Sequence, residues 1–155
     1  MQNAITGFLL GIAVVGYTAT GSAADRPLVD AHIHYSHDAW KGLPPAKAVK
    51  LPRKAGLIKA FVSSSSNKGT QLLYKAAPDL IVPVLRPYRK RGELGSWMHD
   101  DSVIKMLETR LATNKYAGIG EFHAFGNDVN TNALRRVISL AKQYGIFYIP
   151  IRMLR

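Results

Sequence analysis

The 155-residue sequence predicts an α/β fold in which short buried strands alternate with amphipathic helices. Five apolar runs follow residue 25, and their first residues lie 23 to 37 positions apart, the spacing typical of repeated strand–helix units. The runs read as apolar on both faces, which suits a parallel sheet buried under helices. The predicted strands are residues 28–34, 57–62, 80–85, 117–121 and 146–151.

Helix signals fill the first intervals between the strands. Pro45 can open a short helix at Ala46, and Pro52 should break that helix early because proline cannot donate a backbone hydrogen bond. A longer helix is expected over residues 67–77, with leucines on one face and an end just before Pro78.

Two further helices are indicated in the second half of the chain. Polar residues 100–102 can cap a helix whose apolar positions recur at helical spacing as far as Leu111. Asn130 or Thr131 can start the next helix, which Gly145 should close in a left-handed conformation.

These elements predict a partial (β/α)8 TIM barrel over residues 25–155, with about five parallel strands and four helices. A closed barrel needs roughly 250 residues, so this length corresponds to its N-terminal half. An open doubly wound sheet is the alternative, but no glycine-rich phosphate loop follows the first strand. A half barrel leaves two sheet edges unpaired, and we expect homo-oligomers that cover them.

The first residues have the pattern of a secretory signal. Residues 4–19 are apolar and uncharged, and small residues follow up to Ala23 and Ala24, where cleavage is expected. We therefore predict a signal peptide over residues 1–24, a periplasmic or secreted location and no membrane span after cleavage. An uncleaved membrane anchor is the alternative, although the stretch is short for a span and glycines interrupt it.

Composition limits the possible chemistry. The chain has no cysteine, which excludes disulfides and thiolate ligands, so any metal must be held by histidine and carboxylate. The formal net charge is +11, and the densest basic cluster is residues 86–91. No nucleic-acid-binding motif accompanies this cluster, so we predict no nucleic-acid partner and regard the charge as a solvated surface or as balance for a missing partner.

Candidate metal ligands stand at the ends of two predicted strands. Alternation along the first strand places His32 and His34 on one face, where two imidazoles can share one metal ion. Glu121 ends the fourth strand, and His123 follows on the same face if that strand continues. Working residues of parallel βα folds lie at these carboxyl ends. A solvated pair of histidines and an ordinary ion pair of Glu121 are the simpler alternatives.

Other polar residues lie near the same edge of the predicted sheet. Arg86 and Tyr88 follow the third strand and could meet an anionic substrate, although solvated charge is the commoner outcome. Residues 63–66 are expected to form a flexible turn, and His37 with Asp38 a polar loop. His99 is expected to be exposed.

The chain resembles the amidohydrolase superfamily of metal-dependent hydrolases from about residue 27 to residue 151. Residues 29–34 resemble the first-strand His-x-His signature, and residues 118–123 resemble the fourth-strand segment of amidohydrolase-related members. The resemblance implies a TIM barrel whose divalent metal, most simply Zn²⁺, activates water against an amide, ester or related bond of a small-molecule substrate. By this resemblance His32, His34 and Glu121 would be metal ligands. From their positions after the third strand and at the end of the fourth, Arg86, Tyr88 and His123 are predicted to contact the substrate.

The chain departs from the family pattern beyond the fourth strand. The family takes histidines from its fifth and sixth strands and an aspartate from its eighth, whereas the fifth strand here carries Arg152 where a histidine is expected. Arginine does not deprotonate to become a ligand. We therefore expect a truncated enzyme that is weakly active or inactive. A non-catalytic α/β module that binds anionic ligands through residues 86–91 is the alternative.

Overall fold

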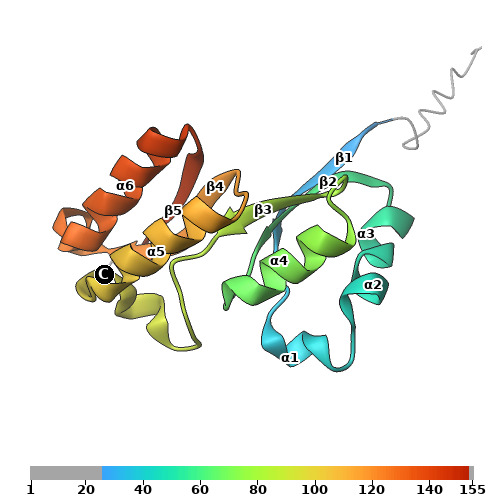
Figure 1. Ribbon diagram of the computed structural model, residues 1–155, viewed down its shortest axis with the longest axis horizontal. Helices are drawn as coiled ribbons and strands as arrows, with labels where there is room; N and C mark the ends of the chain where they lie inside the picture. Colours follow the sequence, from blue (N-terminus) through green and yellow to red (C-terminus); the bar gives the residue numbers. More distant parts are fainter. Residues whose placement is uncertain (1–25, 154–155) are drawn as a thin grey trace, which may run out of the picture.

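The computed structural model describes residues 26–153, and the predicted signal peptide at residues 1–24 lies outside them. The described residues form one five-stranded parallel sheet in the order β1-β2-β3-β4-β5 (Figure 1). This topology confirms the predicted α/β class and the five parallel strands. The strands are β1 (Leu28–Ile33), β2 (Leu57–Ser63), β3 (Ile81–Leu85), β4 (Gly118–Phe125) and β5 (Phe147–Met153).

The three long helices match the sequence pattern closely. Thr131 caps α6, where its hydroxyl accepts a hydrogen bond from the backbone of Leu134, and Gly145 ends the helix at φ 63°. The structure has the α-helices α1 (His37–Trp40), α2 (Pro45–Ala48), α3 (Lys50–Lys54), α4 (Asn67–Ala76), α5 (Ser102–Thr113) and α6 (Asn132–Tyr144), and the 3₁₀ helices η2 (Glu93–Gly95), η3 (Trp97–His99) and η4 (Gly126–Asn130). No helix among residues 26–153 has the length and apolar character needed to cross a membrane.

Two local predictions are wrong. His37 and Asp38 form the first turn of helix α1 instead of a loop. Pro52 lies inside helix α3 instead of ending a helix. It is tolerated there because α3 begins at Lys50, so Pro52 falls in the first turn, where backbone N–H groups lack an intrahelical partner.

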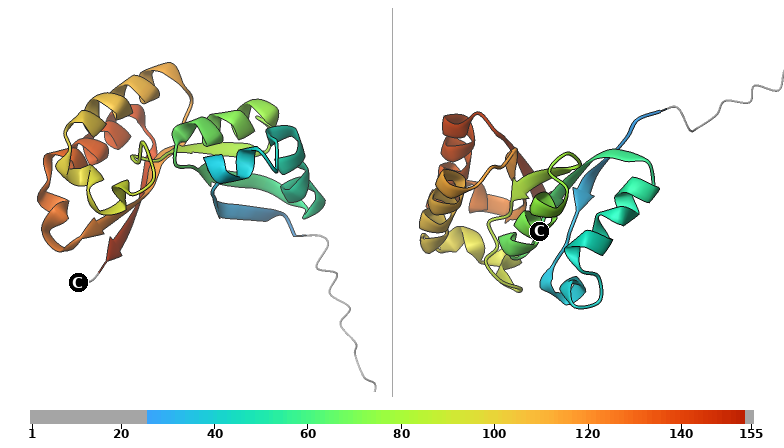
Figure 2. Two further views of the ribbon diagram at one scale, coloured as in Figure 1. Left: turned by 90° about the horizontal axis from the view of Figure 1, so that it is seen from below. Right: turned by 45° about the vertical axis from the view of Figure 1, so that its right-hand side comes forward.

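The sheet is curled. The rings of Phe61 on β2 and Phe147 on β5 lie 5.9 Å apart between centroids, although β3 and β4 separate these two strands. A flat sheet would place β2 and β5 about 14 Å apart, because neighbouring strands lie ~4.8 Å apart. Figure 2 shows the helices on one face of the curled sheet and no helical layer on the other. The described chain is therefore an open half-barrel.

Two separate apolar cores support the sheet. The N-terminal lobe, defined here as β1, β2 and α1–α4 with the start of β3, packs around Ala60, Val62 and Leu73. The C-terminal lobe, defined as β4, β5, α5 and α6 with the end of β3, packs around Trp97 and Phe122. β3 and β4 join the lobes and are in register only at Val84–Gly118 and Leu85–Ile119, whereas β4 pairs with β5 from Gly118 to Phe125 with one irregularity between Gly120 and Phe122.

Glycine at position 118 allows β5 to pack against β4. A Cβ atom at Gly118 would lie 2.1 Å from the ring of Phe147, so any side chain here would displace that ring. Gly120 is also constrained, because it has φ 145° and a Cβ there would lie 2.9 Å from Ile149. The small residues that precede Glu121 thus bring the last strand close to the strand that carries this carboxylate.

Candidate metal centre

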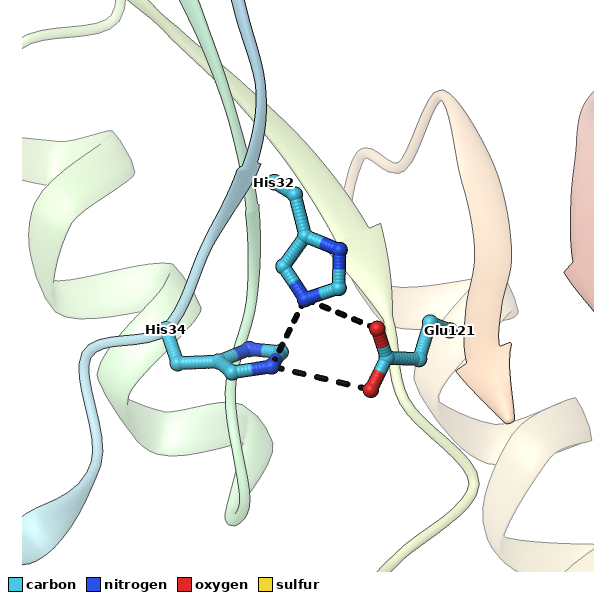
Figure 3. A group of neighbouring side chains, drawn as sticks. All are labelled: His32, His34 and Glu121. Carbon is cyan, nitrogen blue, oxygen red and sulfur yellow. Dashed lines mark hydrogen bonds and ion pairs between the residues drawn. The ribbon is translucent and has the colours of Figure 1, made fainter. Parts of the chain in front are cut away.

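The carboxyl ends of β1 and β4 bring His32, His34 and Glu121 together (Figure 3). His32 Nε2 lies 2.7 Å from Glu121 Oε2, and His34 Nε2 lies 3.6 Å from Glu121 Oε1. The two Nε2 atoms are 2.9 Å apart. One ligand atom from each residue lies within 4.8 Å of the others, and this is the only such group of three among residues 26–153. The curl of the sheet makes this convergence possible, since two strands separate β1 from β4.

His34 is held in one orientation by its neighbour strand. Its Nδ1 donates to the backbone carbonyl of Ser63, the last residue of β2, and this leaves Nε2 facing Glu121. Metal-binding histidines commonly have such a partner on the second ring nitrogen, which fixes the tautomer. Burial lowers the pKa of His34, and the positive charge of Arg86 acts in the same direction. Both effects favour the neutral imidazole that a metal requires.

His32 is the most exposed member of the group, with 51% of its side chain accessible. Its backbone N–H donates to Asp30 Oδ1 at 2.9 Å, which fixes the end of the strand rather than the ring. The ring nitrogen faces both Glu121 and His34, and two imidazole nitrogens in such contact need a shared proton or cation between them. Donor atoms around a tetrahedral Zn²⁺ would be about 3.3 Å apart, given bond lengths of about 2.0–2.1 Å.

Glu121 is buried, and Arg86 compensates its charge. Arg86 Nη2 donates to Glu121 Oε1 at 2.5 Å, and Arg86 Nε donates to the Glu121 carbonyl at 3.2 Å. The backbone N–H of Glu121 donates to Ser63 Oγ at 3.3 Å. The ion pair that was the simpler alternative for Glu121 is therefore present, and it occurs together with the two histidines. The other carboxylate oxygen, Oε2, faces His32, whereas Arg86 contacts Oε1.

The three predicted substrate contacts form one network beside this centre. His123 lies within β4, and its backbone N–H donates to the Tyr88 hydroxyl at 2.7 Å. The same hydroxyl lies 2.9 Å from His123 Nδ1, and the Arg86 guanidinium lies 4.6 Å from the Tyr88 ring centroid. Arg86 and Tyr88 are buried rather than solvated, while His123 is half-buried. Arg86 and Tyr88 also line a cavity of about 180 Å³.

The basic cluster at residues 86–91 is largely neutralised within the chain. Arg89 contacts Glu93 and Asp100 at 2.7 and 2.6 Å, and Arg91 pairs with Asp38. With Arg86 paired to Glu121, Lys90 is the cation of this cluster that has no ion pair within the described residues. Little free charge therefore remains here for the anion-binding alternative.

Ser63 and Ser65 contribute contacts that the sequence pattern did not indicate. Ser63 holds His34 through its carbonyl and Glu121 through its hydroxyl, and Ser65 Oγ accepts from Arg86 Nη1 at 3.3 Å. Ser63 is the last residue of β2, Ser65 lies in the bend that follows, and their contacts join both halves of the centre. In the structure Ile33 lies opposite Val62, and this register, which a single sequence does not display, places His34 next to Ser63. His99 is exposed as predicted and lies 3.3 Å from Asp128.

The donor set fits a divalent cation such as Zn²⁺. Two imidazole nitrogens and one carboxylate oxygen are ligands that Zn²⁺ takes in catalytic sites, where a fourth position is left for water. Comparisons of the chain with protein-family models, with curated proteins and with solved structures find no match. What the centre can do is therefore judged from its donor atoms, distances and charges.

Proposed function

We propose that the chain is the N-terminal half of a TIM-barrel, metal-dependent hydrolase of the amidohydrolase type. The observation that carries this proposal is the convergence of His32, His34 and Glu121 from the carboxyl ends of β1 and β4. Their donor set is that of a catalytic Zn²⁺ site, and the curled parallel sheet is the scaffold on which such sites are built. We place the mature chain in the periplasm or outside the cell.

The chain's own residues would bind and orient the reacting groups. A bound Zn²⁺ supplies a water of lowered pKa and polarises the bond to be cleaved. Burial lowers the pKa of His34 and favours its neutral ring, and the Ser63 carbonyl holds Nδ1 so that Nε2 faces the centre. Glu121 supplies one negative charge that Arg86 stabilises in a buried position. His123 would contact a small-molecule substrate together with Tyr88, which holds it and lines the neighbouring cavity.

The proposed activity is weak or absent. The described residues bring no fourth histidine or carboxylate to the centre, so no second group is in place to accept a proton from water. Arg86 Nη2 also donates a hydrogen bond to Glu121 Oε1, and this weakens that oxygen as a metal ligand or a base. The proposal therefore separates metal binding, which is expected, from turnover, which is expected to be slow.

Zinc titration of the full chain tests this assignment. We expect one Zn²⁺ per chain by calorimetry, and at least ~100-fold weaker binding in His34→Ala, because losing even an outer partner of a ligand costs about 10–100-fold. His99→Ala is the matched control, since His99 is exposed and lies outside the group. Equal zinc affinity in the wild type and in His34→Ala would contradict the proposal.

A further inference from the structure

A second polar cavity lies between helices α4 and α5. It is lined by the first turn of α4 at residues 66–68, by Arg86, Tyr88 and Arg89 after β3, and by Met106 and Arg110 of α5. Its volume is about 100 Å³. Since a water molecule needs about 10–15 Å³ by the same measure, the cavity has room for one small ion or several waters.

The lining of this cavity is strongly cationic. Lys68, Arg86, Arg89 and Arg110 line it, and no aspartate or glutamate does. Arg86 and Arg89 are engaged by acidic partners elsewhere. Lys68 and Arg110 have no ion pair within residues 26–153, and the Lys68 ammonium lies 5.4 Å from the Trp40 ring centroid. The two opposite walls therefore each present one uncompensated positive charge.

The amino end of α4 adds to this field. The helix has ten residues, and its N-cap, Ser66, makes no side-chain hydrogen bond to the first turn. The first N–H groups of a helix lack intrahelical partners and carry the positive end of its dipole, so they attract anions. Serines at positions 63–66 lead directly from β2 into this turn, which makes a short strand-to-helix connection of the kind that can hold an anion.

A buried amide in the wall of the groove gives further support. Asn67 is 6% exposed, and neither its Nδ2 nor its Oδ1 makes a hydrogen bond. Gln71 Nε2 and the Tyr116 hydroxyl are also buried without one. Burial raises the pKa of Tyr116, and the side chains of Asn67 and Gln71, which face its hydroxyl as hydrogen-bond partners, act in the opposite direction. The Tyr116 hydroxyl can partner one group of each amide, and the second N–H of Asn67 Nδ2 is then the buried donor that is left for a group bound in the groove.

We propose that the α4–α5 groove binds a phosphate group, either as inorganic phosphate or as the end of a phosphomonoester. Its oxygens would accept from the first turn of α4 and from Asn67 Nδ2, while Lys68 and Arg110 approach from opposite walls. A phosphate matches this site better than a carboxylate, because its second negative charge at neutral pH meets the second uncompensated cation. The groove shares Arg86 with the metal centre, but Lys68 and Arg110, its two cations without an ion pair, lie outside that centre.

Calorimetric titration of the metal-free, full-length chain with inorganic phosphate at constant ionic strength tests the proposal. We expect one site, and about tenfold or weaker affinity in Arg110→Gln and in Lys68→Gln, because each removes a charge-assisted hydrogen bond. Both side chains are exposed and unpaired, so neither change should disturb folding. Lys142→Gln in the last turn of α6 removes an equal charge from a residue that does not line the groove, and it should leave the affinity unchanged.

Three outcomes would overturn the proposal. Equal weakening in Lys142→Gln would show diffuse attraction to a basic chain, and equal binding of acetate would show a general anion surface. Absence of phosphate binding would show that water alone satisfies Asn67. Titration with glycerol 3-phosphate distinguishes the two forms of the ligand. A site for inorganic phosphate should exclude this ester, and a site for the end of a phosphomonoester should bind it. Binding retained in His34→Ala separates this groove from the metal centre.

Discussion

His32 and His34 are held by the edge strand β1, whose side chains are mostly exposed, whereas Glu121 is held by β4, which is buried along most of its length. The histidine side chains are 51% and 34% exposed, and the carboxylate is 7% exposed. One part of the candidate centre is therefore fixed by a packed core, and the other depends on a strand that has a neighbour on one side only. The precision of such a centre is limited by its more weakly supported half.

The cores of the two lobes explain this difference. Fifteen buried residues, including Trp97, Met98 and Phe122, form the C-terminal core, and nine mostly smaller residues form the N-terminal core. Burial of large side chains contributes most of the stabilisation of a core. Because the β3–β4 register is short, the contacts of Ser63 and Arg86 with Glu121 also link the lobes. The candidate centre is thus part of the connection between them.

The largest expected effect comes from emptying the C-terminal core. Trp97→Ala removes a fully buried ring that packs on Phe122 and donates to the His123 carbonyl at 3.0 Å. We expect the free energy of unfolding to fall by about 3–5 kcal/mol in urea titrations. Trp40→Ala, in the N-terminal lobe, alters a half-buried ring and should cost clearly less. Equal losses in the two variants would show that the lobes do not differ.

A second large effect is expected where the lobes meet. Arg86→Met leaves the buried Glu121 without its strongest partner, and we expect a loss of about 3 kcal/mol of unfolding free energy. Adding Glu121→Gln should restore much of this loss, because the uncompensated charge is then removed. The control is Arg136→Met, which breaks the much more accessible pair with Glu108 and should cost under about 1 kcal/mol. Similar losses for Arg86→Met and Arg136→Met would contradict this account.

Local sequence patterns predicted the elements of both lobes better than their junction. The five strands, the cap at Thr131 and the left-handed Gly145 follow from period, spacing and residue type. The helical turn at His37 and the position of Pro52 inside a helix could not be predicted in this way. Each depends on the exact residue at which a short helix begins. Boundaries of this kind depend on tertiary contacts that a single sequence does not display.

Residue type made the candidate centre predictable, whereas the residues that support the centre could not be recognised by type. His32, His34 and Glu121 are chemically distinctive and stand at strand ends, where working groups of parallel folds lie. Ser63 acts largely through a backbone carbonyl, which every residue has, so its type carried no signal. The pairing of Arg86 with Glu121 required the register of β3 and β4, and two residues 35 positions apart give no local indication of it.

A moderate effect is expected from pH, and it should arise in the weaker lobe. The pKa of His34 is lowered in the folded chain, mainly by burial, so the unfolded chain binds the proton more readily near pH 6. Stability from this group is then complete above its unfolded pKa of about 6.5 and declines as pH falls through the lowered value. Chemical unfolding between pH 7.5 and 5 should show this decline, and His34→Gln should flatten it. An unchanged slope in His34→Gln would exclude His34 as the source.

The smallest change in stability is expected at the free edge of β5, where the readout is association. We propose that copies of the chain cover their exposed edges, and a lysine on an edge strand opposes such pairing. Tyr148→Lys should raise the monomer fraction in sedimentation experiments and alter unfolding by no more than about 0.5 kcal/mol. Ile138→Lys is the matched control, because Ile138 is 42% exposed on α6 and Tyr148 is 44% exposed on β5. If both variants dissociate equally, or if the wild type is monomeric at every concentration, the strand edges are not the contact between copies. The weaker N-terminal lobe then has to be stable without support from a second copy.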